Sequence, residues 1–318
     1  MKAGQRVLNL VAGMVTGFVL APTGAQAVPT YHALLVGPHY PGGNAFDDTI
    51  AGTRMNQFAT EMGQWGNWNP ANITTLTGVL AANSFLDALT AKQQVVDKDD
   101  VFVLIYHGHG DSDWFRTQVL NPPAPKFGND GEIIPPNGIA ANVQDEALTF
   151  RSDATAQFQM TDDALGAAIR GFSATATKLV ITISCFGGGM WGGGDGDMGP
   201  TDNRIAFIGG VRENHFCPEP PPIYQKLFAT VENENSGTIS IQDLYTSVAS
   251  TGAVTGDHWF VGDIPAGVST SFESMLAGTY DVDFMTPIFF DVSEAPGMAM
   301  LGLGLAGLGA ATRRRRAR

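Results

Sequence analysis

The alternation of apolar and polar residues along the chain predicts alternating strands and helices. Runs of consecutive apolar residues, rich in β-branched and aromatic side chains, are typical of strands buried on both faces of a parallel sheet. Between these runs, apolar residues recur at helical spacing, often after a capping residue. The predicted strands are Tyr31–Gly37, Ile73–Thr77, Val101–Tyr106, Leu179–Ser184 and Asn203–Gly209. The predicted helices are Phe46–Met62, Phe85–Val96, Thr161–Ile169, Ile223–Val231 and Ile241–Val248.

This order of elements predicts an α/β fold, a three-layer sandwich with a mostly parallel, doubly wound sheet and helices on both faces. Some stretches predict irregular structure instead. Residues 111–150 contain five prolines and predict a surface loop. Residues 187–199 contain eight glycines and predict no regular element, and residues 251–292 hold only scattered strand-like pieces.

The first 27 residues have the layout of a secretory signal peptide. Lys2 and Arg6 precede an apolar stretch from Val7 to Ala21, and Ala25-Gln26-Ala27 has the small-residue pattern of a cleavage site. The alternative, a transmembrane anchor, fits less well because the apolar stretch is short. The mature chain is therefore predicted to begin near Val28 and to be exported.

The C-terminal segment, residues 293–318, consists of a short motif, an apolar run and an arginine cluster. These parts are Glu294-Ala295-Pro296, residues 297–312, and Arg313–Arg316 followed by Arg318. The layout resembles the PEP-CTERM sorting tail of Gram-negative bacteria, with Glu-Ala-Pro in place of the usual Pro-Glu-Pro. The resemblance implies an exosortase-type sorting enzyme as partner and export across the inner membrane. It also implies anchoring through residues 297–312 before processing, and a periplasmic, cell-surface or extracellular location.

Between these ends we expect one main domain, residues 28–250, and a strand-rich extension of it, residues 251–292. Seven basic residues and one acidic residue lie in the two terminal segments, so the 18 basic and 31 acidic residues of the whole chain become 11 and 30. The resulting net charge of about −19 argues against nucleic acid as a partner. It is compatible with calcium as a ligand.

Candidate chemistry gathers at the ends of two predicted strands. His107 and His109 follow Val101–Tyr106, and Cys185 ends the run from Leu179. In open α/β sheets the functional crevice lies beyond the carboxyl ends of the strands, so we expect these residues to lie side by side. A thiol becomes a good nucleophile beside an imidazole. The alternative is that Cys185 is a buried thiol, or forms a disulfide with Cys217, the only other cysteine.

Two sequence blocks at these strand ends match blocks of a known family. Tyr106-His-Gly-His-Gly110 is similar to the Tyr-Ser-Gly-His-Gly segment of caspase-like cysteine peptidases, the fold shared by caspases, metacaspases and legumains. Ile183–Met190 is similar to the x-x-Cys-x-Ser/Gly-Gly segment of the same family. Further segments that resemble the family are Asp145–Leu148, Thr161–Leu165 and Asn203–Ile208. The resemblance covers roughly residues 31–248.

The resemblance implies a cysteine-type endopeptidase acting on proteins or peptides, with no cofactor required. Cys185 would attack the peptide carbonyl, and His109 would protonate the leaving amine, through a thioacyl intermediate. The N–H groups of Gly110 and Cys185 would form the oxyanion hole. The non-enzymatic alternative is a surface or matrix protein on a degenerate form of this fold, with Cys185 held by Cys217.

Substrate binding is less fully determined by the resemblance. Metacaspases and legumains carry an acid two residues before the nucleophile, where this chain has Ile183, so a basic preference is not implied. The candidate substrate-binding residues are Asp111, Asp145, Asp153 and Ser184.

Two further motifs suggest metals. His107-x-His109-x-Asp111 resembles the first zinc motif of metallo-β-lactamase-type hydrolases, which gives a second alternative, a zinc-dependent hydrolase; Ser112 replaces that motif's final histidine. The segment from Glu232 to Asp243 resembles an EF-hand calcium loop with Gly237 at its sixth position. The candidate calcium ligands are Glu232, Glu234, Ser236 and Asp243. The alternative for this segment is a polar turn between two helices.

Overall fold

The structure, a computed structural model, describes the central part of the chain. The described residues are 28–41, 50–81, 83–112, 116, 146–151, 157–190, 198, 204–209, 222–233, 237–249 and 285–290. The predicted signal peptide and the predicted sorting tail lie outside this part. Within these ranges, no helix combines the length and the apolar character that a membrane span requires.

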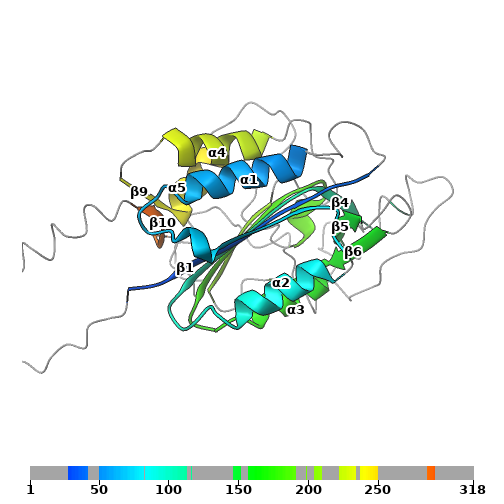
Figure 1. The fold of residues 1–318 in the computed structure, drawn as a ribbon, viewed down its shortest axis with the longest axis horizontal. Coiled ribbons are helices and arrows are strands. Elements are labelled where there is room, and N and C mark those ends of the chain that lie inside the picture. The colour runs from blue at the N-terminus through cyan, green and yellow to red at the C-terminus, as the bar shows by residue number, and fades with distance from the viewer. Residues whose placement is uncertain are drawn as a thin grey trace, which may run out of the picture.

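A parallel sheet of five strands forms the centre of the molecule (Figure 1). Its strands are β1 (Tyr31–Pro38), β2 (Ile73–Gly78), β3 (Val101–His107), β7 (Thr177–Ile183) and β8 (Ile205–Gly209). They lie side by side in the order β2-β1-β3-β7-β8, and every neighbouring pair is parallel. Every residue of β1, β3, β7 and β8 is buried, as their largely apolar sequences predict.

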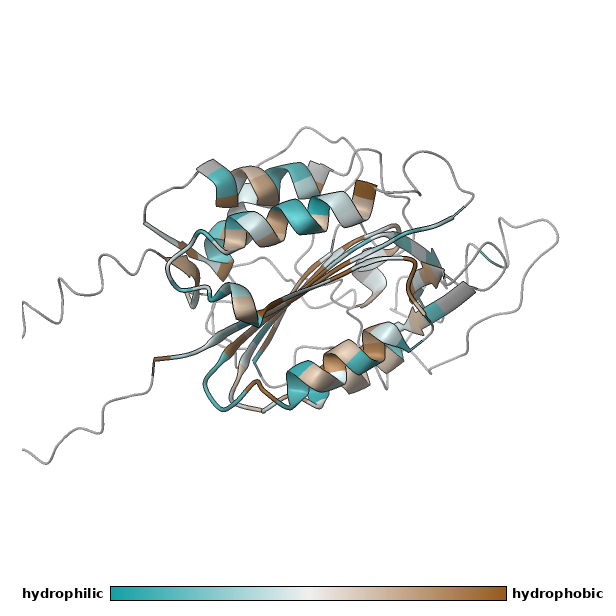
Figure 2. Ribbon diagram, in the orientation of Figure 1, coloured by the Kyte–Doolittle hydropathy of each residue, from teal (hydrophilic) through white to brown (hydrophobic). Residues whose placement is uncertain are grey.

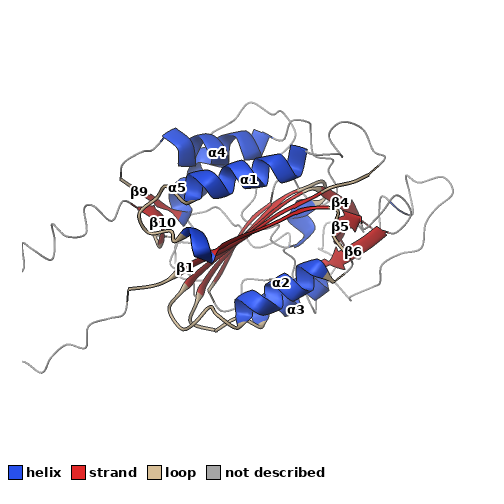
Figure 3. Cartoon of the chain, viewed as in Figure 1, coloured by secondary structure: helices blue, strands red, loops and turns tan. Residues whose placement is uncertain are grey.

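Helices cover both faces of this sheet, so the predicted α/β sandwich is confirmed (Figure 3). The helices are α1 (Ala51–Met62), α2 (Ser84–Gln93), α3 (Asp162–Arg170), α4 (Pro222–Asn233) and α5 (Ile241–Ala249). Figure 1 shows α1, α4 and α5 on one face and α2 and α3 on the other. Two short 3-10 helices, η2 (Pro70–Asn72) and η4 (Gly187–Met190), complete the helical elements of the described ranges.

Alternate residues of each strand divide the core into two apolar layers. In β3, Val103 and Ile105 face the layer of α1, α4 and α5, whereas Phe102, Leu104 and Tyr106 face the layer of α2 and α3. The helices contribute residues at helical spacing, and in α1 these are Ala51, Met55, Phe58 and Met62. Figure 2 shows hydrophobic residues concentrated along the central strands, and hydrophobic and hydrophilic residues interleaved along the helices. Burial of these two layers is the main stabilising contribution to the fold.

A second, antiparallel sheet corrects the prediction of a loop over residues 111–150. It consists of β4 (His109–Ser112), β5 (Glu146–Arg151) and β6 (Gln157–Thr161), in the order β4-β5-β6. His109 is the register partner of Thr149 on β5. A strand therefore begins at the predicted catalytic histidine and continues through part of the expected loop.

A small two-stranded sheet at the other end of the molecule joins distant parts of the sequence. β9 (Thr238–Ser240) pairs antiparallel with β10 (Pro287–Phe290), which belongs to the predicted strand-rich extension. The backbone carbonyl of Ile288 accepts hydrogen bonds from the side chains of Asn67 and Trp68, both at 2.9 Å. Ile288 and Phe289 are buried in the α1–α4–α5 layer, so β10 shares the core of the main domain.

Candidate active site

The first strand end at the site carries the two histidines. β3 ends at His107, and the N–H of Gly108 continues its pairing with β7 by donating to the carbonyl of Ile183 at 3.1 Å. The chain then enters β4 at His109, which is only half-buried. One glycine therefore separates a residue of the central sheet from a residue of the second sheet.

The second strand end carries the thiol. β7 ends at Ile183, the register partner of His107, and Ser184 and Cys185 follow in a turn. The N–H of Gly187 closes this turn by donating to the carbonyl of Ser184 at 3.3 Å. Phe186 has a left-handed backbone with φ of 56°, which costs about 1–2 kcal/mol for a residue other than glycine. The sharp turn leaves Cys185 partly exposed beyond the sheet edge.

Gly110 is where the two segments meet. A Cβ atom added at Gly110 would overlap the backbone oxygen of Cys185 and lie 2.9 Å from its carbonyl carbon. The same atom would lie 3.3 Å from the hydroxyl oxygen of Ser184. The structure thus brings together Gly110, Ser184 and Cys185, three residues predicted from the strand ends. The segment that follows His109 packs directly on the turn that holds Cys185. Only a glycine permits this approach.

His107 is a buried packing residue. Its ring is fully buried and stacks on the ring of Tyr224, with centroids 5.5 Å apart. The guanidinium group of Arg54 contacts both rings. One of its nitrogens lies 3.3 Å from His107 Nε2, and its carbon lies 4.9 Å from the centre of the Tyr224 ring. Since a guanidinium only donates, Nε2 accepts and the ring proton of the neutral imidazole is on Nδ1. Burial, with added repulsion from Arg54 and His109, lowers the pKa of His107 to about 3.

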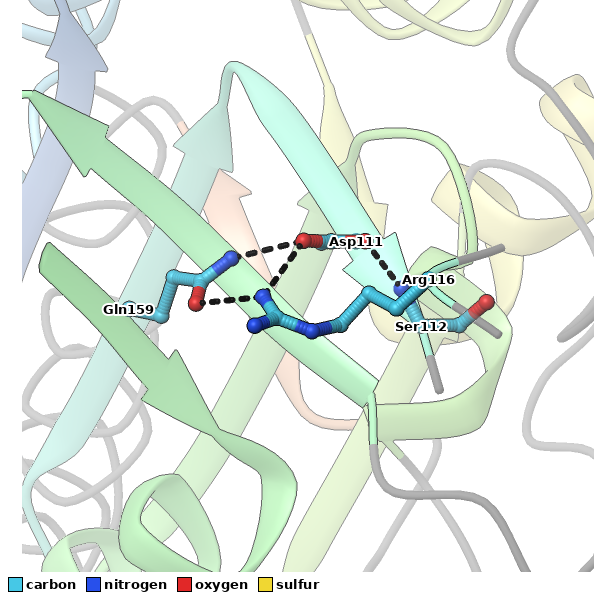
Figure 4. A network of polar contacts seen from close by, with 4 residues as sticks. All are labelled: Asp111, Ser112, Arg116 and Gln159. Atoms are coloured by element: carbon cyan, nitrogen blue, oxygen red, sulfur yellow. Dashed lines mark hydrogen bonds and ion pairs between the residues drawn. The ribbon is translucent and has the colours of Figure 1, made fainter. Parts of the chain in front are cut away.

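Asp111 belongs to an internal polar network (Figure 4). One carboxylate oxygen accepts from the N–H of Ser112 at 2.9 Å, and the other accepts from Arg116 at 3.2 Å and from Gln159 at 2.7 Å. Arg116 also donates to the side-chain oxygen of Gln159 at 3.1 Å. The carboxylate of Asp111 therefore helps to tie β4 to β6, and its predicted contact with substrate stays a prediction.

The other predicted binding residues are placed less fully. Ser184 is buried, and its hydroxyl lies between Gly110 and Gly187, under the cysteine turn. Asp145 and Asp153 lie outside the described residues. Ile183 is buried in the α1–α4–α5 layer, so the position two residues before Cys185 carries an apolar side chain and no acid.

The zinc alternative finds little support in the arrangement of its donors. His107 Nε2 faces a permanently cationic guanidinium, and the carboxylate of Asp111 is used by Arg116 and Gln159. Within the described ranges, no three or more His, Cys, Asp or Glu side chains are grouped so that they could hold a metal ion.

The predicted calcium loop lies between α4 and α5. Gly237 has φ of +112°, a conformation that favours glycine, and α5 begins at Ile241. The carboxylate of Asp243 accepts from the N–H and the hydroxyl of Ser240, at 2.8 and 2.7 Å, and so caps this helix. Glu232 is exposed at the end of α4, and Glu234 and Ser236 lie outside the described residues. Calcium binding stays a prediction.

Two residues at the site were not anticipated. Tyr40, after the end of β1, accepts a hydrogen bond from the N–H of His109 at 2.9 Å, and its ring meets the imidazole edge-on at 4.6 Å between centroids. Glu146 is fully buried at the start of β5, and a Cβ atom added at Gly189 would collide with its carboxylate. The signal available in the sequence for Tyr40 was its position at the carboxyl end of a strand. Glu146 had no such signal, because it lies on β5, a strand that the sequence does not suggest.

Two solved structures are similar to this chain, without support from sequence. No family model matches the chain, and no curated protein matches it by sequence. The chain is similar to the protein GSU0716 from Geobacter sulfurreducens, with 15% sequence identity and a TM-score of 0.49, over 74% of this chain and 94% of that one. It is also similar to the initiator caspase Dronc of Drosophila, with 11% identity and a TM-score of 0.42, over 82% of this chain and 85% of that one.

Proposed function

We propose that the chain is a cysteine-type endopeptidase, with Cys185 as nucleophile and His109 as its acid–base partner. One observation carries the proposal: Gly110, which follows His109, packs directly on the backbone of Cys185. Cys185 is partly exposed in a turn, and His109 is half-buried at the start of β4. These are the placements that a nucleophile and a general acid require, since both must reach a substrate.

The reaction proposed has two balanced halves. The thiolate of Cys185 forms a bond to the substrate carbonyl carbon, and the carbon–nitrogen bond breaks as the His109 imidazolium gives its proton to the leaving amine. Water then attacks the thioester while His109 takes a proton from it, and the carbon–sulfur bond breaks to release the acid and the thiolate. Backbone N–H groups of Gly110 and Cys185 are proposed to stabilise the oxyanion in both halves.

Labelling with peptidyl electrophiles is the direct test. The wild-type chain, Cys185→Ala, His109→Ala and His107→Ala are treated with a panel that varies the side chain at the first position, and hydrolysis of matching peptides is followed. We expect Cys185→Ala to lose labelling and hydrolysis, His109→Ala to lose hydrolysis, and His107→Ala to keep both. Turnover retained by Cys185→Ala would reject the proposal. A Cys185 thiol that reacts only after reduction would instead favour the disulfide with Cys217 and a non-catalytic surface or matrix protein.

We further propose that the chain is exported and sorted at the inner membrane of a Gram-negative bacterium. The support is the sequence of residues 1–27 and 293–318, with their apolar runs, cleavage-site pattern and terminal arginines. N-terminal sequencing and intact mass of the protein from envelope and culture fluid test this. A mature N-terminus near Val28 and loss of the arginine tail are expected; an intact chain in the cytosol would reject it.

A further inference from the structure

Two buried tyrosine hydroxyls stand beside His109. Tyr40 lies in the segment after β1, and Tyr106 is the penultimate residue of β3, so they approach the site from neighbouring strands. Both side chains are almost fully buried, and their oxygens are 3.1 Å apart. A buried pair of hydroxyls has a desolvation cost and is retained where its hydrogen bonds are satisfied.

These hydroxyls bind the backbone of the proposed catalytic histidine on both sides. The N–H of His109 donates to the Tyr40 hydroxyl at 2.9 Å, and that hydroxyl donates to the carbonyl of Thr149 at 2.7 Å. The Tyr106 hydroxyl lies 2.7 Å from the carbonyl of His109 and 2.7 Å from that of Thr149, so its single proton is shared between two acceptors. Both polar backbone groups of His109 are therefore fixed by tyrosine side chains.

The local backbone is shaped to admit the pair. A Cβ atom added at Gly108 would lie 2.5 Å from the Tyr40 oxygen and 2.6 Å from the Tyr106 oxygen, so only glycine fits between β3 and β4. The Tyr40 ring also meets the His109 ring edge-on. Backbone and imidazole of the same residue are thus held from one side by one tyrosine.

The Tyr106 hydroxyl stays protonated near neutral pH. Burial raises the pKa of Tyr106 well above its ordinary value, with smaller contributions from Tyr40 and from the negative charge of Cys185. Tyr106 therefore remains a hydrogen-bond donor to the histidine backbone.

We propose that Tyr40 and Tyr106 are positioning residues, whose hydroxyls clamp the backbone of His109 and so aim its imidazole at Cys185. The proposal rests on the proposed function, in that it gives the histidine a task. It predicts that loss of either hydroxyl weakens the coupling between His109 and the thiol while substrate binding changes little. Phenylalanine is the informative replacement, because it keeps the ring and its contact with His109 and removes only the hydroxyl.

The test combines a kinetic readout with one that needs no substrate. Tyr40→Phe, Tyr106→Phe and His109→Ala are compared with Tyr31→Phe, which removes a buried hydroxyl that donates to the carbonyl of Pro287 at 3.0 Å, at the opposite edge of the sheet. The rate of alkylation of Cys185 by iodoacetamide is followed against pH by mass spectrometry of the Cys185 peptide. Thermal melting of each variant checks that it folds.

We expect kcat to fall by about 10–100-fold in each site tyrosine variant, with KM within about threefold, since small displacements of a catalytic group have effects of this size. The alkylation midpoint should shift upward toward that of His109→Ala, while Tyr31→Phe matches the wild type. Site variants that match Tyr31→Phe in both readouts would overturn the proposal.

The two readouts separate the failure of this inference from the failure of the proposed function. If no peptide is hydrolysed but the alkylation midpoint depends on His109 and on both tyrosines, the peptidase proposal fails and the positioning role stands. If the midpoint depends on His109 but on neither tyrosine, the positioning role fails alone. A midpoint that ignores His109 overturns both.

Discussion

The two histidines on either side of Gly108 have opposite environments. His107 ends β3 inside the α1–α4–α5 layer, where its ring is buried, neutral, stacked on Tyr224 and bonded to Arg54. His109 begins β4, half-buried, with its backbone held by two tyrosine hydroxyls. The same residue type thus serves as a packing group in one sheet and as the proposed acid–base group in the next. Because His107 is buried and His109 is half-buried, His109 is the better placed of the two to reach a substrate.

The largest loss of hydrolysis is expected when β4 can no longer approach the turn that holds Cys185. Gly110→Ala places a methyl group on the backbone oxygen of Cys185, so β4 or the cysteine turn must move. We expect hydrolysis to fall by about 100-fold or more, measured as kcat/KM. Gly63→Ala is the control, because its Cβ would meet its neighbours at 3.4 Å or more, in ordinary contact. Equal activity of the two variants would contradict the packing of Gly110 on Cys185 as a feature of the working site.

The sequence predicts the central sheet, which carries His107, far better than the second sheet, which carries His109. Four of the five strands of the central sheet, all except β2, are largely apolar and fully buried, so hydrophobicity alone predicts that they exist. Cys185 and His109 were identifiable because each closely follows such a run. The expected alternation of strands and helices therefore located the candidate nucleophile and its partner.

The second sheet was not predictable in the same way. β4 has the sequence His-Gly-Asp-Ser, which has low strand propensity, and it is a strand because β5 pairs with it. β5 follows a proline-rich stretch that predicts a loop. The hydroxyl of Tyr40 contacts backbone groups of β4 and β5, and the sequence shows only that Tyr40 follows the carboxyl end of a predicted strand. The second sheet and the contacts of Tyr40 depend on tertiary pairing of segments with low strand propensity, so the sequence pattern does not predict them.

Alanine substitutions at the two histidines are expected to have opposite effects on stability and on hydrolysis. His107→Ala removes a buried ring from its stack on Tyr224 and from Arg54. We expect the free energy of unfolding to fall by about 1–3 kcal/mol, as for other losses of buried, bonded groups, while kcat/KM stays within about threefold of the wild type. Urea denaturation and hydrolysis assays measure the two effects. His109→Ala should show the reverse pattern, and a large loss of hydrolysis in His107→Ala would contradict the division of roles.

The pH dependence of stability provides a finer test of His107. Its pKa is about 3 in the folded chain, against about 6.5 for an unperturbed histidine. Between these values the unfolded chain binds a proton at this residue and the folded chain does not. Stability is therefore fully present above about pH 6.5 and is lost as the pH falls toward 3, with a slope of up to about 1.4 kcal/mol per pH unit.

His107→Phe keeps a ring to stack on Tyr224 and removes the titrating group. Urea denaturation of the wild type and this variant from pH 4 to pH 8 measures the difference, since the carboxylates contribute equally to both. We expect the variant to lose less stability than the wild type as the pH falls below 6.5. Parallel curves would show that the His107 ring takes up its proton at the same pH in the folded and unfolded chains, which would contradict its lowered pKa.

The smallest effect is expected at the α4–α5 turn, which Figure 1 places at the end of the molecule away from β4. Calcium is proposed to bind there weakly, because the carboxylate of Asp243 already caps α5 and must be shared. A site with a Kd of about 10⁻³ M adds about 1.4 kcal/mol of stability at about 10 mM calcium. Thermal melting with calcium or magnesium measures it, with Glu232→Gln as the variant that lacks one exposed candidate ligand. Because the turn is remote from Cys185, calcium should raise the melting temperature and leave kcat/KM unchanged. Equal shifts with magnesium, or an undiminished shift in Glu232→Gln, would assign the turn to helix connection alone.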